Sequence, residues 1–85
     1  MHWAAITNRA DVIPLLARAG VDINGIDEHG YTPLMYAATI DFGDTTTAEA
    51  LVAAGADKTI RNENGRTPLA QAVHFGHSRL AQVLR

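Results

Sequence analysis

Histidine is the residue type in this sequence best suited to holding a metal ion. His74 and His77 lie three positions apart, and His2 and His29 lie elsewhere in the chain. A zinc site needs further cysteine, histidine or carboxylate ligands at defined spacings, and the sequence has no cysteine and no supporting carboxylate at such a spacing. We therefore expect no metal site and no cofactor.

Acidic and hydroxyl side chains are the next candidates, because paired carboxylates or an activated serine support catalysis. Five acids recur at one period and fall in predicted turns: Asp22, Asp27, Glu28, Asp57 and Glu63. Asp22 and Asp57 are expected to bond loop backbone, and Asp27 with Asn62 to shape the start of a loop. Ser78 has no evident base, and no phosphate-binding or nucleophile-elbow motif is present. We therefore expect the protein not to be an enzyme.

The composition is that of one small folded domain. The 85 residues are 47% hydrophobic and 19% charged, which favours a folded domain over a disordered tail. No apolar run approaches the roughly 20 residues needed to cross a membrane, and residues 1–5 lack the features of a signal peptide. We expect a soluble protein with no membrane partner and the cytoplasm as its favoured compartment.

Charge is distributed unevenly along the chain. Residues 1–57 hold eight acids against two bases, whereas residues 58–85 hold one acid against five bases. Such asymmetry can steer a partner or promote head-to-tail association, but this small excess of bases gives weak support for nucleic-acid binding. We expect no nucleic-acid partner.

Two short sequence motifs recur at the same spacing and mark helix boundaries. Gly-Tyr-Thr-Pro-Leu at 30–34 and Ala-Gly-Val-Asp at 19–22 both return in similar form 35 residues later. Thr32 and Thr67 can cap helices, the prolines after them suit the first helical position, and the glycines at 20 and 55 can end helices. First helices are predicted over 34–39 and 69–75, and second helices over 11–19, 45–54 and 78–85. The polar segments between units suit hairpin-like loops.

These words, the paired alanines and a period of roughly 33 residues resemble the ankyrin-repeat family over essentially the whole chain. The resemblance implies an all-α solenoid of stacked helix-turn-helix units joined by β-hairpin-like loops. It implies one domain over 1–85, with approximate repeats 1–29, 30–64 and 65–85. The first unit lacks the family's Thr-Pro, and His77 falls at the family's Gly-His turn, where it has a structural use.

Several positions depart from the family pattern, and Met35 and Ala70 replace the family histidine that His2 keeps. A two-residue insertion near residues 41 and 42 predicts a longer turn inside the second unit. Asn8 stands where the family prefers glycine, and asparagine tolerates a left-handed backbone. Pro14 is tolerable only if its helix begins near residues 10 and 11. The apolar residues of the second helices are expected to form the core between units: Val12, Ile13, Leu15, Leu16, Leu51, Val52, Leu80, Val83 and Leu84.

The resemblance also implies a protein-interaction module, in which loop tips and exposed parts of the first helices form a concave face that meets a protein partner. The matching positions are Ile26, Glu28, His29, Tyr31, Thr39, Ile40, Arg61, Glu63, Asn64, Arg66, His74 and Phe75. Tyr31 and Arg66 are the foremost candidates, because they occupy equivalent positions and belong to types enriched at interface hot spots.

The alternative hypothesis is structural. In it the chain is a fragment or the terminal part of a longer ankyrin array and has no partner of its own, and the missing first Thr-Pro favours this reading. Repeat arrays need about three units and polar caps. The alternative therefore predicts either self-association through an end face or a marginally stable monomer.

Overall fold

The computed structural model describes residues 1–40 and 45–85, and these residues form α-helices without a β-strand. The helices are α1 (His2–Ile6), α2 (Ile13–Arg18), α3 (Pro33–Thr39), α4 (Thr46–Ala53), α5 (Pro68–His74) and α6 (Ser78–Leu84). In chain order they make three pairs, α1 with α2, α3 with α4 and α5 with α6. The insertion predicted near residues 41 and 42 lies outside the described residues.

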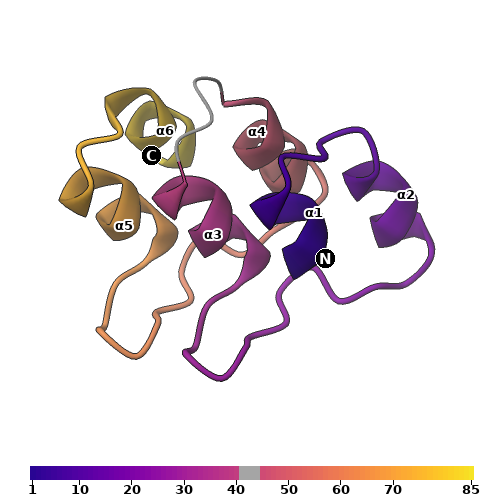
Figure 1. The fold of residues 1–85 in the computed structure, drawn as a ribbon, viewed down its shortest axis with the longest axis horizontal. Helices are drawn as coiled ribbons and strands as arrows, with labels where there is room; N and C mark the ends of the chain where they lie inside the picture. The colour runs from indigo at the N-terminus through magenta and orange to yellow at the C-terminus, as the bar shows by residue number, and fades with distance from the viewer. Residues whose placement is uncertain (41–44) are drawn as a thin grey trace.

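The helices are arranged in two layers (Figure 1). The first layer contains α1, α3 and α5, and each of these helices contacts the next one. The second layer contains α2, α4 and α6, which contact each other in the same order. The loops before α3 and α5 project from the edge of the first layer that lies away from the second layer (Figure 1). This stack is the all-α solenoid that the sequence predicts.

The two Thr-Pro words begin α3 and α5, as predicted. The Thr32 hydroxyl oxygen accepts a hydrogen bond from the Met35 N–H, and the Thr67 hydroxyl oxygen accepts one from the Ala70 N–H, both at 3.2 Å. A proline occupies the first helical position in each case, where no intrahelical N–H bond is lost. Both helix starts are therefore determined by local sequence.

The predicted left-handed positions are also confirmed. Gly20 and Gly55, which follow the ends of α2 and α4, have φ of 87° and 96°. Asn8, between α1 and α2, also has a positive φ, at 56°, and it is the one non-glycine residue with this conformation within residues 1–40 and 45–85. Glycine adopts this conformation without strain because it has no Cβ atom, and asparagine tolerates it better than most residues. These three positions can therefore turn the chain at low cost.

The prediction for the start of α2 was wrong by two residues. The helix begins at Ile13 and not near residues 10 and 11, so Pro14 is its second residue. Pro14 still lies in the first turn, where the backbone N–H has no intrahelical partner, and the helix tolerates it. The other predicted helix ends differ from the observed ones by one residue at most.

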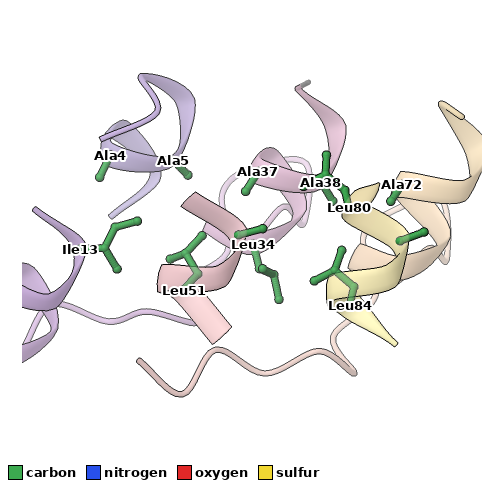
Figure 2. Packing of buried hydrophobic residues seen from close by; sticks show 12 residues of the cluster. Ala4, Ala5, Ile13, Leu34, Ala37, Ala38, Leu51, Ala72, Leu80 and Leu84 are labelled. Atoms are coloured by element: carbon green, nitrogen blue, oxygen red, sulfur yellow. The ribbon is translucent and has the colours of Figure 1, made fainter. Parts of the chain in front are cut away.

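Small side chains let neighbouring helices of the first layer approach closely. The two adjacent alanines of α1 and of α3 are buried, and so is Ala72 at the matching position of α5. Leucine or isoleucine side chains from α2, α3, α4 and α6 fill the space beside these alanines. Figure 2 shows this core as a row that crosses all three pairs. The labelled residues are Ala4, Ala5, Ile13, Leu34, Ala37, Ala38, Leu51, Ala72, Leu80 and Leu84.

Two residues are called equivalent when they hold the same position in different helix pairs. In the first layer, positions are counted from Ala4, Ala37 and Ala72, which are equivalent to each other. In the second layer, they are counted from Ile13, Ala48 and Ala81. Both counts follow the repeated sequence words. Equivalent residues can then be compared between pairs, although α1 and α2 contact each other less than the two helices of the second pair or of the third pair do.

The core prediction was wrong for Leu15, whose side chain is 59% exposed. Ile13, Leu51, Leu80 and Leu84 are buried, and the remaining predicted core residues are half-buried against them. Leu15 is equivalent to Ala50, which lines a hollow between α2 and α4. No described helix lies on the outer side of α2 (Figure 1). The Leu15 side chain, which is the equivalent one in the first pair, is therefore left open.

Candidate functional site

The loop before α3 is shaped by Asp27. Its Oδ1 atom accepts hydrogen bonds from the N–H groups of His29 and Tyr31, both at 2.9 Å. The Asp27 N–H donates to the Tyr31 carbonyl oxygen at 3.0 Å, which closes a hairpin-like turn. This is the side-chain to backbone role that the sequence predicts for Asp27.

The loop before α5 repeats this geometry with Asn62. Its Oδ1 atom accepts from the N–H groups of Asn64 at 2.9 Å and Arg66 at 3.1 Å. The two loops are joined directly, because the Glu63 N–H donates to the His29 carbonyl oxygen at 3.3 Å. The sequence-predicted tip residues of successive loops therefore lie beside each other.

The outermost side chains of this edge are Ile26, Glu28, His29, Arg61, Glu63 and Asn64, and all six are exposed. The His29 imidazole lies 3.7 Å from the Glu28 carboxylate and 3.6 Å from the Glu63 carboxylate, so it spans the two loops. The Arg61 guanidinium donates to the Gly65 carbonyl oxygen of its own loop at 2.8 Å. We call these six residues the tip surface.

Tyr31 and Arg66 lie deeper than the tip surface, because both are bound to Gln71 of α5. Gln71 is fully buried, and its Nε2 atom donates to the Tyr31 hydroxyl oxygen at 2.9 Å and to Thr39 Oγ1 at 2.8 Å. The Arg66 guanidinium donates to Gln71 Oε1 at 3.4 Å. Three predicted partner-binding residues thus converge on one glutamine that also holds α3 and α5 together.

Sequence reasoning did not single out Gln71. Its neighbours in the helix, Ala70 and Ala72, gave a signal, because a long amide flanked by small residues on a helix that packs closely must find partners when buried. The partners themselves lie 32 and 40 residues earlier in the chain. No local pattern identifies them.

A second polar network, also missed, is built on Tyr36 of α3. The Tyr36 hydroxyl donates to the second carboxylate oxygen of Asp27, and its ring lies 5.0 Å from that of Tyr31. The hydrogen bond to Asp27, followed by burial, raises the pKa of Tyr36 to about 12. Burial acts to raise the pKa of Asp27, but the bonds from Tyr36, Tyr31 and His29 outweigh it, and the pKa is lower than usual.

The predicted helix-end positions differ between α3 and α5. Thr39 and Ile40 at the end of α3 are half-buried, whereas His74 and Phe75 at the end of α5 are exposed. The rings of His74 and Phe75 meet edge to face with centroids 4.8 Å apart. Of these helix-end positions, those of the third helix pair therefore carry the exposed aromatic side chains.

Two of the histidines, His2 and His77, connect neighbouring helix pairs. His77 Nδ1 lies 2.9 Å from the Ala38 carbonyl oxygen, and His2 Nε2 lies 2.8 Å from the Tyr31 carbonyl oxygen. Within residues 1–40 and 45–85, no group of three or more histidine, cysteine or acidic side chains is arranged to hold a metal ion. In the same residues, no helix has the length and apolar character to cross a membrane.

Comparison with known proteins agrees with this architecture. A family model described as three copies of the ankyrin repeat matches residues 1–62. An ankyrin repeat-containing protein of Schizosaccharomyces pombe is 36% identical over 66 residues, which cover 78% of this chain and 31% of that protein. Protein phosphatase 1 regulatory subunit 27 of Homo sapiens is 34% identical over 68 residues, which cover 80% of this chain and 43% of that protein.

An ARF GTPase-activating protein of Homo sapiens is 38% identical over 85 residues, which cover 99% of this chain and 11% of that protein. The chain thus spans less than half the length of each of these relatives. Both the matched family model and the capped, two-layer helix stack lead to one conclusion: the chain belongs to the ankyrin-repeat family.

Proposed function

We propose that this protein binds a protein partner through the tip surface and the adjoining ends of α3 and α5. Ankyrin repeats are generally non-enzymatic protein-interaction modules. The observation that carries the proposal is that two successive loops present unlike side chains side by side, with Ile26 and Glu28 on one loop and Arg61 on the next. Such a mixed surface can match apolar and charged groups of a partner together.

Rigidity supports the same proposal. Asp27 and Asn62 hold the two loop backbones by hydrogen bonds, and the bond from Glu63 to His29 ties the loops to each other. Loops that are ordered before binding lose little conformational entropy when a partner arrives. Two of the relatives are named as a phosphatase regulatory subunit and as a GTPase-activating protein. These unlike names support a general binding role and point to no common partner.

The proposal is tested by isolating a partner with the intact chain and measuring its affinity for variants by calorimetry. Glu28→Ala, Arg61→Ala and Phe75→Ala each remove an exposed side chain of the proposed face. We expect at least one of them to weaken binding about tenfold or more, the size of effect typical of a hot-spot residue. Arg18→Ala removes an exposed arginine from the second layer and is the matched control, with unchanged affinity expected. Wild-type affinity in all three face variants would refute the proposed face.

Tyr31 and Arg66 need a separate control, because both contact Gln71. Tyr31→Ala and Arg66→Ala are expected to weaken binding, and Gln71→Leu breaks the same network without altering any exposed group. If Gln71→Leu weakens binding as much as the other two, Tyr31 and Arg66 act by positioning α3 against α5. If it leaves the affinity unchanged, the two side chains contact the partner directly.

A further inference from the structure

We propose that Asn64 is a site of spontaneous chemical modification, at which the side-chain amide is converted to a carboxylate. An asparagine that is followed by glycine is prone to this reaction, because glycine has no Cβ atom to hinder the approach of its backbone nitrogen to the asparagine side chain. The chain contains two Asn-Gly sequences, at residues 24–25 and 64–65. The surroundings of the two asparagines differ, and the difference makes Asn64 the reactive one.

The conversion needs water and no other reactant. The backbone nitrogen of Gly65 loses its proton to solvent and forms a bond to Cγ, the side-chain carbonyl carbon of Asn64. The side-chain amide nitrogen takes up a proton and leaves as ammonia, so that a succinimide ring is formed. Water then opens the ring at either of its carbonyl groups. One opening gives aspartate, and the other gives isoaspartate, in which the main chain runs through the former side-chain carbon.

The attacking nitrogen is held in the same way in both Asn-Gly sequences. The Gly65 N–H donates a hydrogen bond to the Asn62 carbonyl oxygen at 2.9 Å. The Gly25 N–H donates one to the Asp22 carbonyl oxygen at 3.5 Å. Each of these turn bonds has to open before the nitrogen can attack. The longer bond at Gly25 opens more easily, so the attacking group by itself does not favour Asn64.

The asparagine side chains account for the difference. Asn24 is half-buried, and its Oδ1 atom accepts a hydrogen bond from the Asp57 N–H at 2.8 Å, which joins the loop after α2 to the loop after α4. The Asn24 side chain can turn towards the glycine nitrogen only after this bond breaks. Asn64 is exposed, and in the described part of the chain it is bonded through its backbone N–H alone. Its side chain can therefore rotate into the reactive position.

The exposure of Asn64 comes from its place at a loop tip and needs no free end of the stack. Its equivalent in the preceding loop is His29, whose side chain is 57% exposed although the next loop bonds to its backbone. The remaining asparagines, Asn8 and Asn62, are followed by residues with a Cβ atom, which hinders ring closure. Asn64 thus combines a following glycine with a freely rotating side chain.

Either product changes the tip surface. Aspartate adds a carboxylate next to Glu63 in the sequence, so the loop before α5 becomes more acidic. Isoaspartate also lengthens the main chain by one carbon inside the turn that Asn62 holds through the N–H groups of Asn64 and Arg66, and it therefore disturbs this turn. An effect on a partner rests on the proposed function, whereas the conversion itself does not.

Incubation of the intact chain at neutral pH, followed by proteolysis and mass spectrometry, measures the loss of each side-chain amide over time. We expect Asn64 to convert roughly fivefold faster than Asn24 or more, the factor that corresponds to one hydrogen bond. Isoaspartate should be among the products, because direct attack of water on the amide gives aspartate alone. The same measurement in guanidinium chloride is the control. Unfolding removes the bond from Asp57, so the two asparagines should then convert at similar rates.

Gly65→Ala should slow the conversion of Asn64, because the added Cβ atom hinders the attacking nitrogen. Gly25→Ala is the matched variant and should leave the conversion of Asn64 unchanged. Circular dichroism verifies that both variants fold. Conversion of Asn24 as fast as that of Asn64 in the folded chain would overturn the proposal. So would an Asn64 amide that is retained in the folded chain but lost in the unfolded one.

Discussion

Asp27 and Asn62 occupy equivalent loop positions and bond their backbones alike, but their second polar atoms differ. The Oδ2 atom of Asp27 accepts from the Tyr36 hydroxyl, whereas the Nδ2 atom of Asn62 is buried without a hydrogen-bond partner. The residue of α5 equivalent to Tyr36 is Gln71, and its side chain bonds to Tyr31, Thr39 and Arg66.

Asp27→Asn should remove a pH-dependent part of the stability. The folded-state pKa of Asp27 lies below its unfolded value of about 4, so its stabilising contribution is full above that pH and is lost as the pH falls through the folded pKa. The variant should be about 1–2 kcal/mol less stable at pH 7, because the Tyr36 hydroxyl loses the charged oxygen that accepts its hydrogen bond. Urea unfolding at pH 7, 5 and 3 should show this gap narrowing with acid, and a constant gap would contradict the assignment to Asp27.

At the scale of elements, loop packing distinguishes two glycines with the same backbone conformation. Gly30 and Gly65 occupy equivalent positions, with φ of 77° and 74°. A Cβ atom at Gly30 would lie 3.1 Å from the Glu63 backbone nitrogen and 3.3 Å from the Asn62 Cα, whereas at Gly65 it would meet nothing within 4 Å. Only Gly30 has a following loop stacked against it.

Gly65→Ala should therefore report backbone strain alone, about 1–2 kcal/mol. Gly30→Ala should cost clearly more, because the neighbouring atoms belong to backbone and cannot rotate away. The free energies of unfolding in urea measure both losses, and the difference between them isolates the contact between loops. Equal losses in the two variants would show that the loops can separate at no cost.

At the scale of the whole molecule, stability depends on neighbours, because each pair is too small to bury its own apolar side chains. Leu51 in α4 is fully buried, with α2 on one side and α6 on the other. The equivalent Leu16 in α2 is only half-buried. Three pairs that share one continuous core should unfold together. The repeat boundaries 1–29, 30–64 and 65–85 remain a prediction from the sequence.

Leu51→Ala should destabilise the protein by about 2–5 kcal/mol, the usual cost of a buried cavity of this kind. Such a loss is a large part of the roughly 5–15 kcal/mol that stabilises a typical domain. Leu16→Ala is the matched control and should cost clearly less. Thermal unfolding followed by circular dichroism should show one transition in each protein. Separate transitions for the two ends of the chain would contradict a single cooperative core.

The sequence alone determined the features that depend on a few adjacent residues. Thr32 and Thr67 cap helices, Gly20 and Gly55 end them, and Asp27 closes a loop, because each of these interactions spans at most four residues. A repeat of such words is enough to identify the helix pairs and their order. The tip surface could be predicted for the same reason, since exposure at a loop tip needs no partner.

Only the tertiary structure decided which residues of neighbouring helix pairs contact each other. Tyr31 and Arg66 turned out to contact Gln71, and Leu15 and Val73 turned out to be exposed although their equivalents are covered. Equivalent words in a sequence predict equivalent local structure, but burial depends on the pair before and the pair after. The end pairs therefore differ from the central pair for a reason that no local sequence pattern contains.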